Sequence, residues 1–416
     1  MSTVQAPAPD PLDGGRLLAR LKDLARFTDV PGEMTRLSLS PAHKAAAGEV
    51  ARWFAGAGMA VHLDATGAVV GRYEGGTPGM PPLILGSHID TVRNAGIFDG
   101  NLGVVVALAV VERLHADGTR LPFPIEVVAF ADEEGVRFPS TLTSSRALAG
   151  RFDPATLDDR DADGISRRAA LEAFGADPAA IAACSRAGRA LGYVEAHIEQ
   201  GPVLEALGLP LGIVTAIAGA TRAVVDVRGQ AGHSGTLPME MRQDALTGAA
   251  EMILAAEARA KGETGLVATV GTLAIPGAAV NVVPGTVRFS LDVRAPDDGQ
   301  RLRAFADITA RIRDIAAARG LQARLDVTYE AAAAPCDPHF QAALSHAAER
   351  LGLPAHRLPS GAGHDGLSLS GAMPIVMLFV RSTNGSHNPR EHAEAADIGL
   401  AAQVLHGFVT AFDPAG

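Results

Sequence analysis

The residues that could do chemistry are histidines and acids gathered in short polar segments near the ends of apolar runs. These segments hold His88 and Asp90; Asp99; Asp132, Glu133 and Glu134; Glu195 and His197; and His387, Glu391 and His392. Mixed imidazole and carboxylate ligands suit Zn²⁺, Mn²⁺ or Co²⁺. An aspartate has two oxygens and can bridge two ions roughly 3.5–4 Å apart, the arrangement used in two-metal hydrolysis. The segments together therefore predict a hydrolytic metal centre.

Each segment also has an ordinary structural explanation. His88 and Asp90 point to one side if the chain is extended there, but a capped loop gives the same pattern. Asp99, just before a helix, suits an N-cap. The alternating segment around His197 suits a half-exposed strand. The segment at 386–392 lacks the HExxH spacing, so either of its histidines could be a ligand.

The three adjoining acids Asp132, Glu133 and Glu134 follow the apolar run at 125–130. Carboxylates this close together repel one another unless a cation lies nearby. Consecutive side chains project in different directions, so one carboxylate can bind metal while its neighbour faces the substrate. A solvated loop is the alternative, but it does not explain why the acids follow so apolar a strand.

Residues 361–366, Gly-Ala-Gly-His-Asp-Gly, match the GxGxxG pattern of dinucleotide-binding loops. The match lies late in the chain, does not directly follow a clear strand and opens no strong helix. We therefore do not expect dinucleotide binding here.

Composition limits the remaining function classes. The 416 residues suggest two or three domains of about 150 residues each. The net charge of −10 argues against a nucleic-acid or anionic-membrane binder. Two cysteines are too few for a disulfide framework or a cysteine-based zinc site. No signal-peptide pattern or run of about 20 apolar residues is present, so we expect a cytoplasmic protein.

The elements that must position these residues alternate between strands and helices. Apolar runs predict strands at 61–63, 68–73, 83–85, 125–130 and 375–380. Helical patterns occur at 16–27, 41–56, 102–115 and 339–352. Strand, helix and strand with short connections predict a mainly parallel sheet covered by helices.

The pattern changes between residues 214 and 331. Strands are expected at 222–228, 265–273, 286–294 and 325–329, and helices at 242–260 and 297–319. This β-α-β-β-α-β order is the ferredoxin-like, split βαβ pattern. We therefore predict an α/β protein: a mainly parallel-sheet metal-binding domain of residues 1–213 and 332–416, interrupted by an inserted α+β domain of residues 214–331.

The order of motifs resembles that of a known family. GSHIDTV, FDGNLGV, DEEGVRF, EAHIEQGP and SHNPREH follow one another as in the M20 metallopeptidase superfamily. The HIEQGP segment and the late histidine are similar to those of its amidase, hydantoinase/carbamoylase branch. The resemblance runs from about residue 15 to the C-terminus. It implies a di-metal hydrolase whose inserted domain is a lid and a dimer interface.

The resemblance also implies roles for particular residues. The metal ligands would be His88, Asp99, Glu134, His197 and His387, with Asp99 between the two ions. Glu133 would be the general base and acid, Asp90 would orient His88, and His233 would stabilise the oxyanion. The substrate would contact Gln200, Asn281, Arg294 and Gly363.

The implied reaction is hydrolysis of a linear, anionic ureido acid by a homodimer that uses two divalent ions. An N-carbamoyl-L-amino acid is the first candidate substrate, and allantoate is the alternative. An aminopeptidase or N-acyl deacylase is a further alternative. A metal-binding scaffold without activity would be expected to lack the intact Glu133–Glu134 pair.

Overall fold

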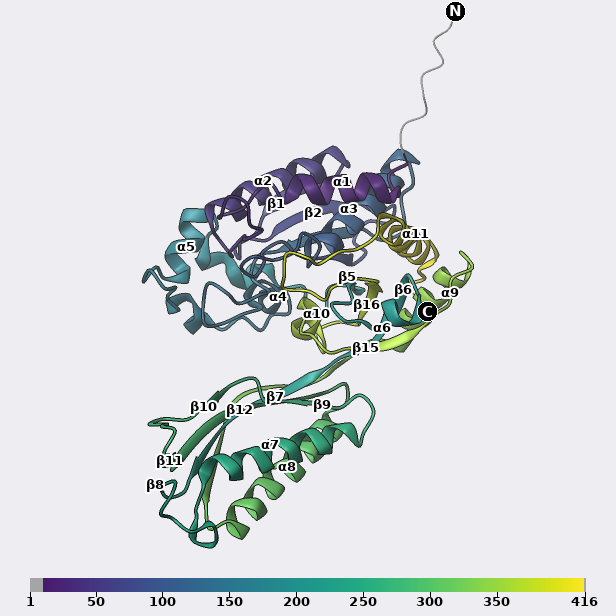
Figure 1. The fold of residues 1–416 in the computed structure, drawn as a ribbon. Coiled ribbons are helices and arrows are strands. Elements are labelled where there is room, and N and C mark those ends of the chain that lie inside the picture. The colour runs from purple at the N-terminus through teal and green to yellow at the C-terminus, as the bar shows by residue number, and fades with distance from the viewer. Residues whose placement is uncertain (1–9, 415–416) are drawn as a thin grey trace, which may run out of the picture. The chain divides into compact units, whose positions relative to one another are not determined.

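The computed structural model describes residues 10–414, which divide into two compact units (Figure 1). The first unit runs to Thr215 and resumes over Cys336–Leu358 and from His364 onward. The second comprises Ala216–Pro335 and Pro359–Gly363. The expected boundary at 213/214 falls inside a strand, because β6 (Leu211–Ile217) continues without a break from one unit into the other. None of the helices in the described range is long and apolar enough to cross a bilayer.

Four parallel strands form the centre of the first unit's sheet. They are β4 (Ile125–Phe130), β3 (Leu83–His88), β5 (Gly192–Ile198) and β16 (Ile375–Val380), in that spatial order. Every residue of these strands is buried, as expected for a sheet covered on both faces. The predicted mainly parallel sheet is confirmed. The interpretation of the His197 segment as a half-exposed strand is wrong, because β5 is central.

The outer strands of this sheet are antiparallel. They are β1 (Ala60–Leu63), β2 (Val69–Tyr73) and β6, and β15 (Arg357–Ser360) also pairs with β6. The sequence analysis predicted β1 and β2 as strands but not β6 or β15. The short β14 (Ala334–Pro335) pairs with the last residues of β6.

Nine α-helices are described in this unit. They are α1 (Gly14–Leu24), α2 (Pro41–Gly56), α3 (Asn101–Ala116), α4 (Thr143–Leu148), α5 (Arg167–Phe174), α6 (Val203–Leu207), α9 (Pro338–Glu349), α10 (Asp365–Leu369) and α11 (Ala395–Ala411). α1, α3 and α11 pack against one another. The apolar run at 104–111 forms the middle of α3, and all eight of its residues are buried.

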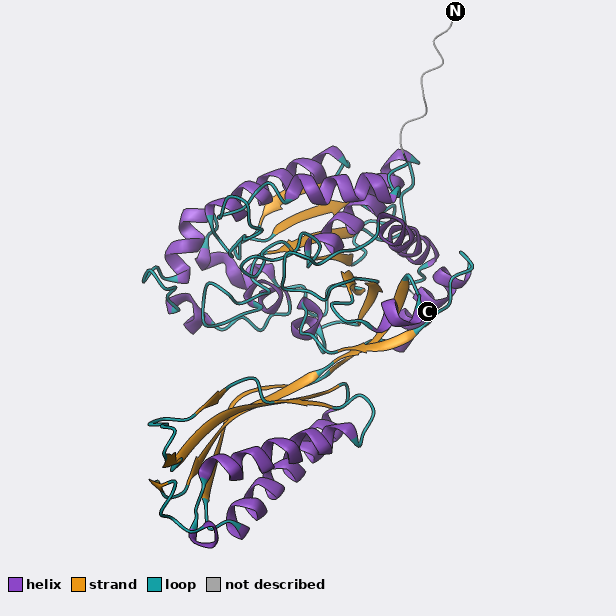
Figure 2. Cartoon of the chain, in the orientation of Figure 1, coloured by secondary structure: helices purple, strands orange, loops and turns teal. Residues whose placement is uncertain are grey.

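The second unit is an antiparallel sheet covered on one face by two helices (Figure 2). The strand order is β10 (Leu273–Ala274), β12 (Thr286–Ala295), β7 (Gly219–Arg228) and β13 (Gln322–Ala331), with β9 (Val267–Thr269) also on β12. The helices are α7 (Ala245–Lys261) and α8 (Asp298–Ala318). The predicted split βαβ order is confirmed. The single strand expected at 265–273 is divided between β9 and β10.

Candidate active site

The carboxyl ends of the four central strands meet at one edge of the sheet, where open α/β sheets place their sites. His88 is the last residue of β3, and His197 lies one residue before the end of β5. Their Nδ1 atoms lie 3.0 Å and 2.9 Å from the main-chain oxygens of Asp90 and Ile198. When Nδ1 donates to a carbonyl in this way, Nε2 has a lone pair for a metal. Both histidines therefore suit metal ligation.

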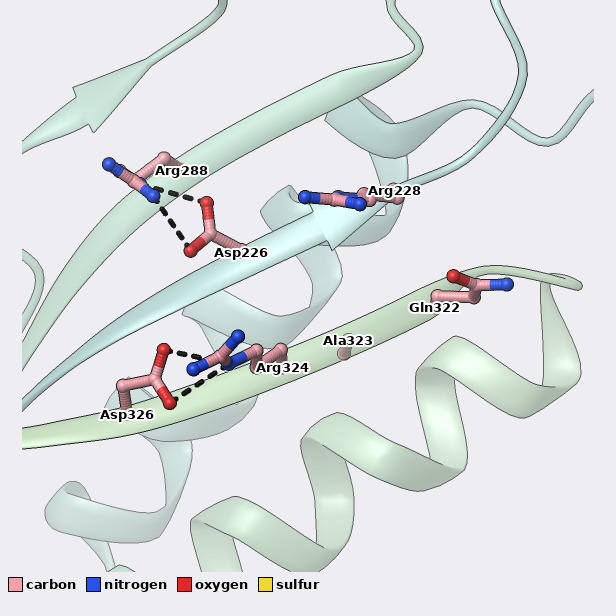
Figure 3. A pocket seen from close by; sticks show the side chains of 7 residues that line it. All are labelled: Asp226, Arg228, Arg288, Gln322, Ala323, Arg324 and Asp326. Atoms are coloured by element: carbon pink, nitrogen blue, oxygen red, sulfur yellow. Dashed lines mark hydrogen bonds and ion pairs between the residues drawn. The ribbon is translucent and has the colours of Figure 1, made fainter.

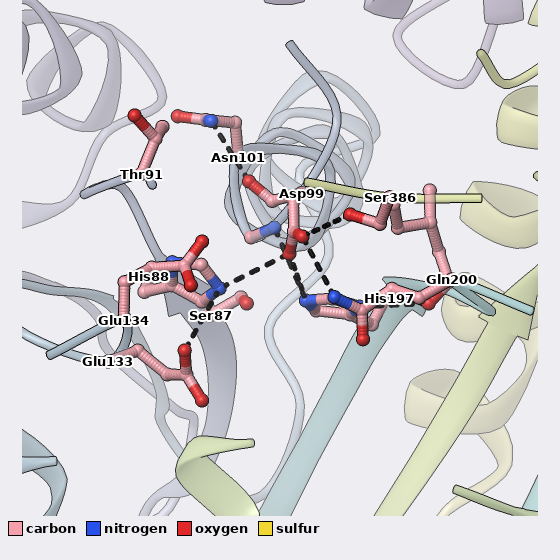
Figure 4. A network of polar contacts seen from close by, with 12 residues as sticks. Ser87, His88, Thr91, Asp99, Asn101, Glu133, Glu134, His197, Gln200 and Ser386 are labelled. Atoms are coloured by element: carbon pink, nitrogen blue, oxygen red, sulfur yellow. Dashed lines mark hydrogen bonds and ion pairs between the residues drawn. The ribbon is translucent and has the colours of Figure 1, made fainter. Parts of the chain in front are cut away.

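Asp99 lies between these histidines in the loop before α3 (Figure 4). Its Oδ1 is 3.2 Å from Nε2 of His197 and 3.6 Å from Nε2 of His88. Its Oδ2 is 3.4 Å from Nε2 of His387. The N-cap interpretation is wrong, because Gly100 holds that position and no side chain caps the helix. Instead, the two carboxylate oxygens face different histidines.

Gly100 is required at that turn. Its φ is +65°, and a Cβ there would lie 2.4–2.5 Å from the ring of His88. Only glycine takes this conformation at little cost and also leaves room for the imidazole.

Two groups of ligand atoms share Asp99. His88, Asp99 and His197 form one group, and Asp99, Glu134 and His387 form the other, with the atoms of each within 4.8 Å of one another. Nε2 of His387 is 3.5 Å from Oε2 of Glu134. Because the donors are imidazole and carboxylate only, each group suits a divalent ion such as Zn²⁺, Mn²⁺ or Co²⁺.

Glu133 and Glu134 lie in the loop after β4, and the buried carboxylate of Asp90 holds this loop in place. Oδ1 and Oδ2 of Asp90 accept the main-chain N–H groups of Glu133 and Glu134, at 3.1 Å and 3.2 Å. The Asp90 carboxylate is 3.6 Å from Nδ1 of His88, farther than the Asp90 main-chain oxygen. The side chain of Asp90 therefore positions the acidic loop, while its main chain orients His88.

Burial raises the pKa of Glu133 well above its usual range, and the neighbouring Glu134 carboxylate adds to the effect. Burial and the Asp99 carboxylate raise the pKa of Glu134 to about 7. The hydrogen bond to Asp99 raises the pKa of His387 to about 8. Buried acids that crowd one another in this way are typical of functional sites.

Asp132 has a different role from the two glutamates beside it. Its carboxylate pairs with Arg167 at 2.5 Å and accepts a hydrogen bond from the Thr143 hydroxyl at 2.7 Å. Both Asp132 and Arg167 are almost fully buried. Asp132 therefore anchors the loop rather than serving the metal groups.

Gln200 was expected to contact substrate. In the structure its Nε2 donates to Oδ2 of Asp99 at 2.8 Å, and its φ of +62° marks a tight turn after β5. Glu199, beside it, is a helix-capping residue, because its carboxylate accepts the main-chain N–H groups of Val203 and Leu204.

His364 belongs to the site but was not predicted. Its fully buried ring packs edge-to-face on His197, with ring centroids 4.5 Å apart. Burial and the neighbouring His197 hold its pKa well below the usual range. The 361–366 segment was expected not to bind a dinucleotide and to contact substrate at Gly363, but its His364 was given no role. That segment follows β15, one of the strands that were not predicted from the sequence.

The inserted domain brings His233 and Asn281 together. β8 (Gly232–His233) pairs with β11 (Val282–Val283), and the main-chain N–H of Ser234 donates to the Asn281 carbonyl at 3.0 Å. Both side chains are exposed.

Arg294 lies on β12 and is held by two partners. Its Nε and Nη2 donate to the two carboxylate oxygens of Asp292, at 2.9 Å and 3.0 Å, and its Nη1 donates to the Gly361 carbonyl at 2.9 Å. Because a guanidinium has five N–H groups, these bonds leave one on each terminal nitrogen. That pair suits a carboxylate.

A pocket on the inserted sheet is a poorer candidate (Figure 3). Two of its three arginines are paired with neighbouring acids, Arg288 with Asp226 and Arg324 with Asp326. No histidine lines it. It therefore lacks the donors of the metal groups.

Comparison with known proteins identifies the family. The model of peptidase family M20/M25/M40 matches residues 84–411. The chain belongs to this family. It is 40% identical over 398 residues to an N-carbamoyl-L-amino acid amidohydrolase of Geobacillus stearothermophilus, covering 95% of this chain and 97% of that one. It is 37% identical over 425 residues to allantoate deiminase 2 of Glycine max, covering 94% and 88%.

A solved structure places the chain more narrowly within the family. An amidase of the hydantoinase/carbamoylase family from Burkholderia multivorans superposes with a TM-score of 0.91 at 34% identity, covering 96% of this chain and 97% of that one. The resemblance inferred from the five motifs is therefore confirmed. The chain is an amidohydrolase of the M20 family's hydantoinase/carbamoylase branch.

Proposed function

We propose that this amidohydrolase cleaves the ureido C–N bond of an N-carbamoyl-L-amino acid, yielding the L-amino acid, CO₂ and NH₃. The observation that carries the proposal is the placement of Asp99, whose two oxygens face two separate sets of ligand atoms. Two divalent ions would be held there, by His88, Asp99, His197, Glu134 and His387. The 40% identity to an N-carbamoyl-L-amino acid amidohydrolase favours this substrate class.

Glu133 is the residue that moves the proton. Two divalent ions bound in the site would lower the pKa of a water and polarise the ureido carbonyl. The Glu133 carboxylate, 3.9 Å from His88 Nε2, takes the proton of the attacking water and returns it to the leaving nitrogen. Asp90 keeps this carboxylate in place through the main chain of the loop.

The inserted domain recognises the rest of the substrate in this proposal. Arg294 binds the substrate carboxylate through the one N–H group on each terminal nitrogen that is not bonded to Asp292 or Gly361. His233 donates to the developing oxyanion, and Asn281 contacts the carboxylate. The side chain of Gln200 and the main chain at Gly363 supply further contacts.

Allantoate is the second candidate substrate, because the 37% identity to an allantoate deiminase covers nearly as much of the chain. Allantoate is also a linear ureido acid with a carboxylate. The same catalytic groups therefore suit it, and only measured turnover separates the two.

An ammonia-release screen tests the proposal. It compares N-carbamoyl-L-amino acids, allantoate, N-carbamoyl-β-alanine and ureidoglycolate, each with Mn²⁺, Co²⁺ or Zn²⁺ added. We expect the highest turnover with an N-carbamoyl-L-amino acid. Higher turnover with allantoate would make allantoate the assigned substrate instead. Ammonia release from none of the compounds would reject the proposed reaction.

Glu133→Gln is the matched variant for this screen. Because general acid–base catalysis contributes roughly 10²–10⁴-fold, we expect a loss of that size with metal binding retained. Turnover like that of the wild type would reject the role of Glu133.

Assembly and location complete the proposal. The enzyme would be a cytoplasmic homodimer joined through the inserted domain. Light scattering of the purified protein and fractionation of cells that produce it would test these two statements.

A further inference from the structure

A buried carboxylate outside the ligand set reaches the loop of the central aspartate. Glu391 is 5% exposed, and its Oε1 accepts the main-chain N–H groups of both Phe98 and Asp99, at 3.0 Å and 3.1 Å. Glu391 lies 292 residues after Asp99 in the sequence. A carboxylate that accepts two N–H groups restrains the main chain that carries them.

The other oxygen of Glu391 acts on the side chain of Asp99. The Ser386 hydroxyl lies 2.5 Å from Oδ2 of Asp99 (Figure 4). The same hydroxyl lies 2.6 Å from Oε2 of Glu391. Main chain and side chain of Asp99 are therefore both tied to the segment at 386–391. That segment also carries His387, which was assigned as a ligand.

The restraint is one-sided. Oδ1 of Asp99 faces His88 and His197, whereas Oδ2 faces His387. Ser386 contacts only Oδ2, the oxygen on the side of His387. Removing the restraint should therefore disturb the group formed by Asp99, Glu134 and His387 more than the other group.

The surrounding chain is shaped around Glu391. A Cβ at Gly96 would lie 2.3–2.5 Å from the Glu391 side chain, so any other residue there would displace it. The segment itself is closed by the Asn384 side chain, which donates to the Arg390 carbonyl at 2.9 Å, and by the main-chain pairing of Thr383 with His392. Glu391 and His387 therefore sit on one internally bonded segment.

We propose that Glu391 is a positioning residue that joins the Asp99 loop to the His387 segment and so determines the affinity of one of the two metal ions. This inference rests on the proposed metal centre. The ion concerned is the one held by Asp99, Glu134 and His387.

The test measures metal stoichiometry and affinity with Glu391→Ala, Glu391→Gln and, as a matched control, Glu394→Gln. Glu394 is an exposed carboxylate three residues after Glu391, just before α11, and its side chain is paired with His392. Each purified full-length protein is stripped and titrated with Mn²⁺ or Zn²⁺, and bound metal is counted by mass spectrometry. Thermal unfolding is recorded alongside.

For Glu391→Ala we expect one ion bound as in the wild type and the other weakened ~10–100-fold, the usual effect of losing a group that orients a ligand. Glu391→Gln should recover most of the affinity, because its amide oxygen can still accept both N–H groups. Glu394→Gln should bind both ions like the wild type.

Three results would contradict the inference. In the first, Glu391→Ala binds both ions with wild-type affinity. In the second, both sites weaken equally, which shows a general effect on the fold. In the third, the wild type itself binds fewer than two ions, which overturns the proposed metal centre and the inference with it. This failure is distinguishable from the first two because it is seen in the wild-type protein alone.

Discussion

Asp90→Asn tests whether one buried carboxylate positions the catalytic loop. Each oxygen of Asp90 accepts one main-chain N–H, from Glu133 and from Glu134. Asparagine is nearly the same size but has only one acceptor oxygen. Its amide NH₂ must therefore face one of the two N–H groups, donor against donor.

The expected magnitude follows from the bond that is lost. A hydrogen bond to a charged group contributes about 1.5–3 kcal/mol, and 1.4 kcal/mol corresponds to about a tenfold change. Because Asp90 is 1% exposed, water cannot replace the lost acceptor. If the loop holds Glu133 for proton transfer, kcat should fall ~10–100-fold.

The assay compares kcat, KM and bound metal of Asp90→Asn with those of Glu199→Gln. Glu199 is a well-matched control, because it also follows a central strand and each of its oxygens accepts one main-chain N–H. Its partners begin α6 and carry no proposed catalytic group. The control should therefore lose stability but keep kcat.

The reasoning would be refuted if Asp90→Asn kept wild-type kcat while its free energy of unfolding fell. It would also be refuted if Glu199→Gln lost as much kcat as Asp90→Asn. The first result would show that Asp90 only stabilises the fold. The second would show that any lost cap at this sheet edge impairs turnover.

Two further predictions concern stability. Arg167→Met should lower the free energy of unfolding by about 3–5 kcal/mol in urea titrations, because it leaves Asp132 buried without its partner; a loss below about 1 kcal/mol would contradict this. Burial lowers the pKa of His43 to about 4, below its ordinary value of 6.5. The unfolded chain then binds a proton at this histidine more readily than the folded chain does. The contribution of His43 to the free energy of unfolding is therefore complete above pH 6.5 and is lost as the pH falls toward 4. Unfolding midpoints measured across that range should fall less in His43→Gln.

The sequence predicted three of the four central strands well because their signals are local. β3, β4 and β16 are apolar runs, and a parallel arrangement brings the carboxyl ends of such strands to one edge of the sheet. β5 was expected to be half exposed because Glu195 and His197 alternate with apolar residues along it. The separate roles of the acids at 132–134 were harder to predict. Adjacent positions show that their side chains point in different directions, but they do not show which acid serves which role. Asp132 is distinguished by its pairing with Arg167, 35 residues away.

The residues that were missed or given no role depend on contacts that local patterns do not encode. His364 follows β15, a strand in which three of the four residues are polar or proline, so its sequence is not apolar enough to predict a strand. Glu391 was noticed as part of a Glu-His pair, yet its partners are main-chain groups near Asp99. Because every residue except proline has a main-chain N–H group, the sequence does not show which of them a buried carboxylate will bind. The sequence could therefore supply the ligands of the proposed metal centre, whereas the groups that fix their positions could be recognised only from the folded arrangement of distant loops.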